Sequence, residues 1–121
     1  MMIKQYILVR TDDIFPLGKI IAHVGHNVLD FVTKKMILEQ WKDYTKNVFL
    51  KWLFEHNQTK IVLNGGKLED IEEIIKKADK IKIPTSFIED IHIKKKIVAV
   101  IGPVDESQAK FLGLDKLRLY K

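Results

Sequence analysis

Short runs of apolar, β-branched residues recur along the chain and predict buried strands. One run covers residues 3–9, and another covers residues 60–63 just before a pair of glycines. A further strand is expected over residues 84–88, beginning at a proline. The run at 97–101 is apolar throughout, so we expect it to be a central strand that ends at Gly102.

Between these runs, apolar residues repeat every three or four positions, which is the period of a helix. A first helix is expected from about Lys19 into the Lys34-Lys35 region, and a third over residues 68–78. A short capped helix at 105–111 and a last strand or extended tail at 117–120 complete the pattern. The second helix is expected to place its apolar and aromatic residues in the core: Trp41, Tyr44, Val48, Phe49, Trp52 and Leu53.

This order of elements, βααβαββα without repeats, predicts an α/β protein with a mixed sheet between two layers of helices. A chain of 121 residues with 46% apolar content suits a single domain over residues 1–121. Neither a membrane-spanning apolar run nor a secretory signal is evident, so we expect a soluble, cytoplasmic protein without membrane contact. The lack of cysteine excludes disulfides and thiolate metal sites.

The net charge gives a modest indication of the kind of partner that the protein binds. The chain carries 21 basic and 16 acidic residues, a net charge of +5, which favours an anionic partner such as nucleic acid. Nineteen of the basic residues are lysine, however, and lysine-rich composition is also typical of heat-adapted or A+T-biased proteomes. Composition leaves both explanations open.

The first helix is the best place to look for a site, because it has one apolar and one polar side. Its polar stripe contains Lys19, His23, His26, Asn27 and Asp30. Its apolar side is expected to be core and contains Ile20, Ile21, Val24, Val28, Phe31 and Val32.

The loop from Arg10 to Gly18 joins the first strand to this helix, and ligands of open α/β sheets bind beyond the carboxyl ends of strands. Lys19 at the helix entrance could hold a phosphate or stabilise an oxyanion, or it could simply be a solvated lysine. His23 and His26 could be a general base or buried structural histidines. They lack a third ligand at suitable spacing, so a metal site is not expected.

A second charged segment follows the strand predicted at 84–88. Glu89 and Asp90 close that strand, and residues 92–96 then concentrate positive charge where two strands meet. A carboxylate near lysines can act as a base or form an ion pair. A charged edge strand that exposes its lysines is the alternative.

Five segments in order along the chain resemble the type 2 peptidyl-tRNA hydrolases of archaea and eukaryotes. The segments are Arg10-Thr11-Asp12, Gly18-Lys19-Ile20-Ile21-Ala22-His23-Val24-Gly25-His26, Ile88-Glu89-Asp90, Ile101-Gly102-Pro103 and Leu114-Asp115-Lys116-Leu117-Arg118-Leu119. The resemblance implies a four-stranded mixed sheet between helices, a homodimer and no metal or organic cofactor. It also implies cleavage of the ester that joins a peptide to the 3′ end of tRNA.

By position, the resemblance implies Lys19 and Asp90 as catalytic residues with His26 beside them. Lys19 and Asp90 would polarise the ester carbonyl and orient a water molecule. The basic surface would bind the tRNA backbone mainly through phosphates. Substrate binding is expected of Arg10, His23, Lys94, Lys95 and Lys96.

The chain also departs from the family pattern. His23 replaces a glutamine, Lys94 stands where a threonine is usual, and the segment from Asp90 to Gly102 is several residues shorter. Our leading hypothesis is therefore a divergent peptidyl-tRNA hydrolase. The alternatives are a non-catalytic relative that binds RNA or protein, and a different small hydrolase with the same strand-to-helix segment.

Overall fold

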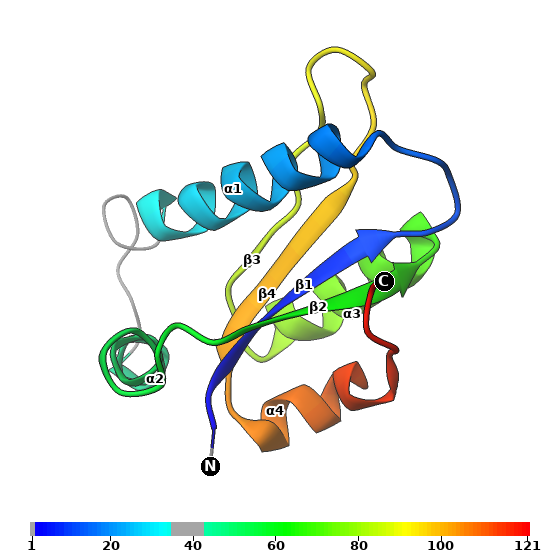
Figure 1. Cartoon of the computed structure of the whole chain (residues 1–121). Helices are drawn as coiled ribbons and strands as arrows, with labels where there is room; N and C mark the ends of the chain where they lie inside the picture. The colour runs from blue at the N-terminus through cyan, green and yellow to red at the C-terminus, as the bar shows by residue number, and fades with distance from the viewer. Residues whose placement is uncertain (1, 35–42) are drawn as a thin grey trace.

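The computed structural model describes residues 2–34 and 43–121 (Figure 1). Four strands form one sheet, and helices lie on both sides of it. The strands are β1 (Lys4–Arg10), β2 (Lys60–Gly66), β3 (Thr85–Ser86) and β4 (Val98–Val104). The helices are α1 (Leu17–Thr33), α2 (Asp43–Phe54), α3 (Leu68–Lys80) and α4 (Glu106–Phe111), followed by a 3-10 helix at Leu114–Lys116.

The strand order is β2-β1-β4-β3, and the sheet is mixed. β1 pairs with β2 in parallel and with β4 antiparallel, and β3 pairs antiparallel with β4. Every residue of β4 is buried, as its uniformly apolar sequence predicts for a strand covered on both faces. The predicted mixed sheet and the central position of this strand are confirmed.

Alternate residues of β1 contact different helical layers. Ile7 and Val9 pack in a cluster with Ile20 of α1, whereas Leu8 packs with Ile71 of α3 and with residues of α4. A third cluster joins the start of β1 to α1 and α2, and its members include Phe31, Phe49 and Trp52. The three-layer α/β/α fold is therefore confirmed, as is the core position of these aromatic residues. Trp41 and the side chain of Tyr44 lie outside the described residues.

Three strand predictions are wrong at their ends. β2 continues to Gly66 instead of ending at residue 63. β3 contains only Thr85 and Ser86 instead of residues 84–88, because the Ile88 N–H donates to a side chain of α1 rather than to a strand. β4 does not end at Gly102 but continues to Val104. Gly102 permits this because it adopts a φ of +86°, next to an irregularity in the pairing with β1.

A further difference concerns α1, whereas the C-terminal segment is as expected. α1 begins at Leu17, two residues earlier than expected, and its Ile21 is 63% exposed instead of buried in the core. The C-terminal segment is an extended tail with one isolated bridge, between Leu63 and Leu119. In the described part of the chain, no helix has the length and apolar character needed to cross a membrane.

Gly102 should be sensitive to substitution, because its left-handed backbone also lies close to its neighbours. A Cβ added there would lie 2.7 Å from the backbone nitrogen of Val104. Gly102→Ala should therefore lower the free energy of unfolding by about 1–3 kcal/mol in a urea titration. Gly25→Ala is the matched control, because a Cβ at this α1 position meets open space. It should raise stability by about 0.5–1 kcal/mol, and equal effects of the two variants would contradict this account.

Candidate active site

Asp90 begins a tight hairpin that leads from the end of the β3 segment back into β4. Glu89 pairs with Lys96 in an antiparallel bridge, and the Asp90 N–H donates to the Lys95 carbonyl at 2.8 Å. Inside the turn, Asp90 Oδ1 accepts the backbone N–H groups of His92 at 2.8 Å and Ile93 at 2.9 Å. One carboxylate oxygen is thus held by the backbone of its own hairpin. In Figure 1 this hairpin is the yellow loop beside the N-terminal end of α1.

The other carboxylate oxygen binds two side chains of α1. Asp90 Oδ2 lies 3.0 Å from Lys19 Nζ and 2.8 Å from His23 Nε2. Only 5% of the Asp90 side chain and 3% of the His23 side chain are exposed, against 31% for Lys19. Because Lys19 and His23 are four residues apart, they lie one helical turn apart on one face. The sequence and the fold therefore bring a lysine, a histidine and an aspartate together across the gap between α1 and the hairpin.

These contacts hold the pKa of Asp90 well below its ordinary value. The Ile93 N–H is the strongest cause, followed by the hydrogen bond from His23, and the Lys19 ammonium and His92 N–H add to them. Together they outweigh the burial of the carboxyl group, which acts in the opposite direction. Asp90 is therefore a fixed carboxylate with four donors, and it is a weak proton acceptor.

The polar stripe of α1 continues beyond His23 towards the C-terminal end of the helix, and there it binds the segment before Asp90. The Asn27 side chain is fully buried; it donates to the His23 carbonyl at 2.7 Å and accepts the Ile88 N–H at 2.9 Å. Ser86 Oγ lies 2.9 Å from Asn27 Oδ1 and 2.8 Å from Asp30 Oδ2. The Ser86 hydroxyl has only one proton to donate. Its acceptor is the carboxylate of Asp30, which is a stronger acceptor than the amide oxygen of Asn27. The stripe therefore faces residues 86–90.

Asn27 and Ser86 thus position the site although sequence reasoning did not select them. The signal for Asn27 was its place in the stripe, eight residues after Lys19, where a helix returns to the same side. Ser86 carried no signal of its own, because its contacts come from residues more than fifty positions away.

A cleft of about 260 Å³ lies over this centre. Its polar residues are Lys19, His23, His26, Glu89, Asp90 and His92, and its apolar residues are Ala22, Ile88 and Ile91. The rings of His23 and His26 meet edge to face, with their centroids 5.3 Å apart. Unlike His23, His26 is exposed. In residues 2–34 and 43–121, no three His, Asp or Glu side chains gather closely enough to hold a metal ion.

The remaining predicted residues line a neighbouring cleft of about 340 Å³. Arg10, Lys94, Lys95 and Lys96 lie there, and Glu89 lines both clefts. Arg10 is already bound within the fold. Its guanidinium donates to both carboxylate oxygens of Asp12 and, at 2.9 Å, to the carbonyl of Lys96. It therefore ties the returning arm of the hairpin to the end of β1.

The three lysines of the hairpin differ in their freedom. Lys94 and Lys95 are exposed, and Lys95 Nζ donates to Asp13 at 2.6 Å. Lys96 is half-buried, with its ammonium 5.2 Å from the centroid of the Phe87 ring. The alternative that the hairpin lysines are exposed to solvent therefore holds for Lys94 and Lys95, and only in part for Lys96.

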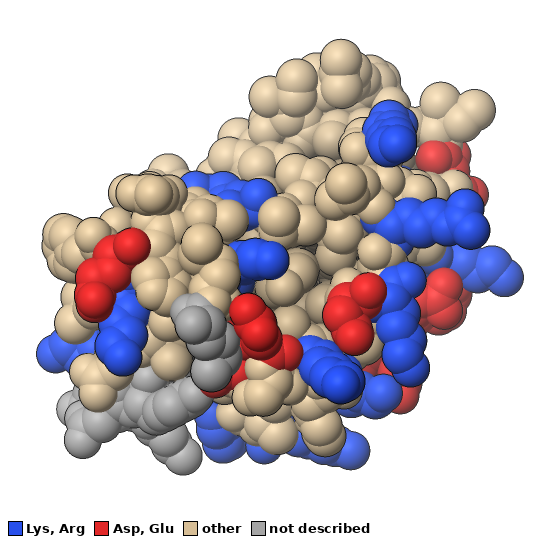
Figure 2. All heavy atoms as spheres, turned by 60° about the horizontal axis from the view of Figure 1, so that its bottom comes forward, with Lys and Arg blue, Asp and Glu red and all other residues tan. Residues whose placement is uncertain are grey.

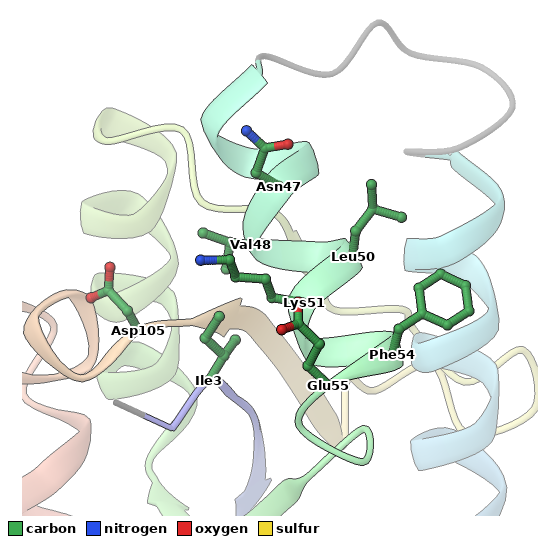
Figure 3. A pocket seen from close by; sticks show the side chains of 8 residues that line it. All are labelled: Ile3, Asn47, Val48, Leu50, Lys51, Phe54, Glu55 and Asp105. Carbon is green, nitrogen blue, oxygen red and sulfur yellow. The ribbon is translucent and has the colours of Figure 1, made fainter.

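A larger cavity, of about 720 Å³, lies near the opposite end of β1 (Figure 3). Its walls come from α2, from Ile3 and from Asp105 before α4, and they include the exposed ring of Phe54. The candidate residues from the sequence do not line it. Asp105 is occupied as the cap of α4, where its carboxylate accepts the Gln108 N–H. This cavity is separate from the Lys19–Asp90 cleft.

The fold and site together define a small three-layer α/β protein with a lysine–aspartate centre between its first helix and a hairpin. A family model described as peptidyl-tRNA hydrolase PTH2 matches residues 3–120, and the chain belongs to this family. The resemblance inferred from the sequence is thereby confirmed.

Curated proteins named peptidyl-tRNA hydrolase from three archaea are similar to this chain. The protein of Metallosphaera sedula is 34% identical over 87 residues, which cover 72% of this chain and 70% of that protein. The protein of Sulfurisphaera tokodaii is 36% identical over 87 residues, covering 72% and 69%. That of Saccharolobus solfataricus is 34% identical over 91 residues, covering 74% and 72%.

The lowered pKa of Asp90 predicts acid sensitivity of the fold. A carboxyl group with a depressed pKa in the folded state stabilises the protein above its unfolded pKa of about 4. This contribution is lost as the pH falls from about 5 towards the folded pKa. Asp90→Asn should therefore lower the free energy of unfolding at neutral pH and make its decline in acid shallower.

Denaturant titrations between about pH 2 and pH 7 measure this difference. Asp13→Asn is the matched control, because the Asp13 pKa is also lowered, chiefly by the hydrogen bond from Lys95. That pair is exposed, so its effect should be smaller and should vanish at about 1 M salt. A decline in acid as steep in Asp90→Asn as in the wild type would contradict the assignment.

Proposed function

We propose that this protein hydrolyses the ester bond between a peptide, or an N-blocked amino acid, and the 3′ end of tRNA, and so releases free tRNA. The observation that carries the proposal is the contact of Asp90 Oδ2 with Lys19 Nζ at 3.0 Å inside a cleft. Membership of the peptidyl-tRNA hydrolase PTH2 family and the names of the archaeal relatives support the same reaction.

In this proposal Lys19 is the electrophilic residue. Its ammonium points a positive charge at the ester carbonyl and stabilises the oxyanion that forms when water attacks the carbonyl carbon. Asp90 neither attacks nor takes the proton, because four donors already hold it as a carboxylate. Its Oδ2 instead holds the Lys19 ammonium in place beside the ester.

His26 is the residue that we assign to proton transfer. It is exposed on the same cleft, and a neutral imidazole can take a proton from the attacking water. The tetrahedral intermediate then breaks the bond to the 3′ oxygen of the tRNA, which receives the proton. The products are a tRNA with a free hydroxyl group and a peptide carboxylic acid, which releases its proton to solvent and becomes a carboxylate.

The hairpin lysines and Arg10 are proposed to bind the tRNA backbone beside the reactive ester. Lys94, Lys95 and Lys96 lie next to the Lys19–Asp90 cleft, where positive charge can meet phosphates. Elsewhere the surface is mixed: Figure 2 shows a face on which Lys and Arg alternate with Asp and Glu. His23 offers a substrate little surface, since 3% of its side chain is exposed.

We further propose that residues 1–121 form one domain that works as a cytoplasmic homodimer. Large exposed apolar side chains, among them Leu29, Phe54 and Phe111, support self-association. Light scattering should give twice the 14.1 kDa mass of one chain. A concentration-independent mass of one chain would contradict the homodimer.

A second candidate function is binding of tRNA without catalysis. The observation that favours it is the short hairpin, whose two inner N–H groups are occupied by Asp90 and cannot serve a substrate. Release of a labelled N-acetyl-aminoacyl group from tRNA separates the two functions. Turnover supports the hydrolase, whereas salt-sensitive tRNA binding without turnover overturns it in favour of the binding module.

Lys19→Ala should lower kcat by about 100-fold or more, because it removes the donor to the developing oxyanion. The labelled-release assay measures this loss, and circular dichroism checks that the variant is folded. Lys80→Ala is the matched control: it removes the same charge from the exposed end of α3, outside both clefts. Wild-type turnover in Lys19→Ala would overturn the assigned role of Lys19.

A further inference from the structure

His23 combines a short hydrogen bond to Asp90 with almost complete burial. Its Nε2 lies 2.8 Å from Asp90 Oδ2, and 3% of its side chain is exposed. Its Nδ1 is buried and has no hydrogen-bond partner in the described residues. The backbone of His23 is held as well, because the Asn27 side chain donates to its carbonyl at 2.7 Å. The ring is therefore fixed at one nitrogen and bare at the other.

This asymmetry indicates which nitrogen carries the proton. A carboxylate oxygen only accepts hydrogen bonds, so Nε2 must donate to Asp90. A proton on Nδ1 would be a buried donor without an acceptor, which is costly. The geometry thus fits an imidazole protonated at Nε2. It also excludes His23 as the base that takes a proton from the attacking water, because its bare nitrogen is closed to solvent.

We propose that His23 is a positioning residue: its Nε2–H fixes the Asp90 carboxylate oxygen that also binds Lys19 Nζ. This inference rests on the proposed ester hydrolysis. The hairpin backbone holds only Oδ1, so the position of Oδ2 depends on the two side chains from α1. Lys19 alone would hold it loosely, since its ammonium sits on a flexible stem that is 31% exposed.

The rigid imidazole ring of His23 restricts the movement of the Asp90 carboxylate oxygen. His23 reaches Asp90 from the helical turn after Lys19, so the carboxylate is clamped between α1 and the hairpin, and the ammonium keeps one direction in the cleft. A displacement of about 1 Å can cost a reaction about 100-fold in rate. The clamp therefore acts on kcat through Lys19 and has little effect on substrate affinity.

This role requires a hydrogen-bond donor to Asp90 at position 23. It does not require a group that gains or loses a proton. Glutamine offers an N–H at comparable reach. Leucine has similar volume and no donor. His23→Gln should therefore keep kcat within about 3-fold of the wild type, whereas His23→Leu should lower it by about 10- to 100-fold with KM changed by less than about 3-fold.

His56→Leu is the matched control. His56 Nδ1 accepts the Ile3 N–H at 2.7 Å, so this variant also loses a histidine hydrogen bond, but it does so outside the Lys19–Asp90 cleft. It should lose stability and keep the kcat of the wild type. All variants are compared after circular dichroism and thermal melting show equal folded fractions.

Nitrogen-15 NMR of the histidine rings in the wild-type protein provides a readout that needs no variant to fold. The expected signature is a proton on Nε2 of His23, and Asp90→Asn should shift that resonance. A neutral ring with its only proton on Nδ1 would overturn the inference, because Nε2 could not then donate to Asp90. So would wild-type kcat in His23→Leu, or a His23→Gln variant as slow as His23→Leu, which would show that the imidazole itself is needed. Wild-type protein without turnover would instead overturn the proposed hydrolysis, and with it the role of His23.

Discussion

The carboxylate of Asp90 is the group on which the site depends. Burying an ionised carboxylate is costly unless donors surround it, and here two backbone N–H groups hold one oxygen while Lys19 and His23 hold the other. The hairpin and α1 each supply half of these donors. Neither element satisfies the charge alone, so the arrangement that neutralises Asp90 also fixes the Lys19 ammonium against the hairpin.

The polar stripe of α1 also binds the segment that leads from β3 to Asp90. Asn27 and Asp30 continue the stripe, and they bind Ser86 and the Ile88 N–H at the point where β3 stops. The short β3 is thus the consequence of a competing partner, because the Ile88 N–H donates to Asn27 of α1 instead of to a neighbouring strand. The exposed side of α1, which includes Ile21, is then left to solvent.

The local sequence pattern predicted the helices and strands, but it did not predict the contacts between them. The apolar pattern predicted the order of strands and helices, because β4 is a continuous apolar run and α3 has an unambiguous helical repeat. It failed at Gly102, where a positive φ lets the strand continue, and at residues 87–88, where a distant side chain ends the pairing. The local pattern made Lys19 and Asp90 candidates with their roles left open, and the family resemblance implied that both are catalytic. The local pattern left open whether His23 is buried, because its partner Asp90 lies 67 positions away.

The central claim is that Lys19 acts as one unit with Asp90, and a double-mutant cycle on kcat/KM tests it most directly. Labelled aminoacyl release is measured for the wild type, Lys19→Ala, Asp90→Asn and the double variant. If Asp90 works by holding Lys19, the double variant should be no slower than the slower single variant, as expected for residues that act together. Losses that multiply in the double variant would show that the two residues act independently, and would contradict the account.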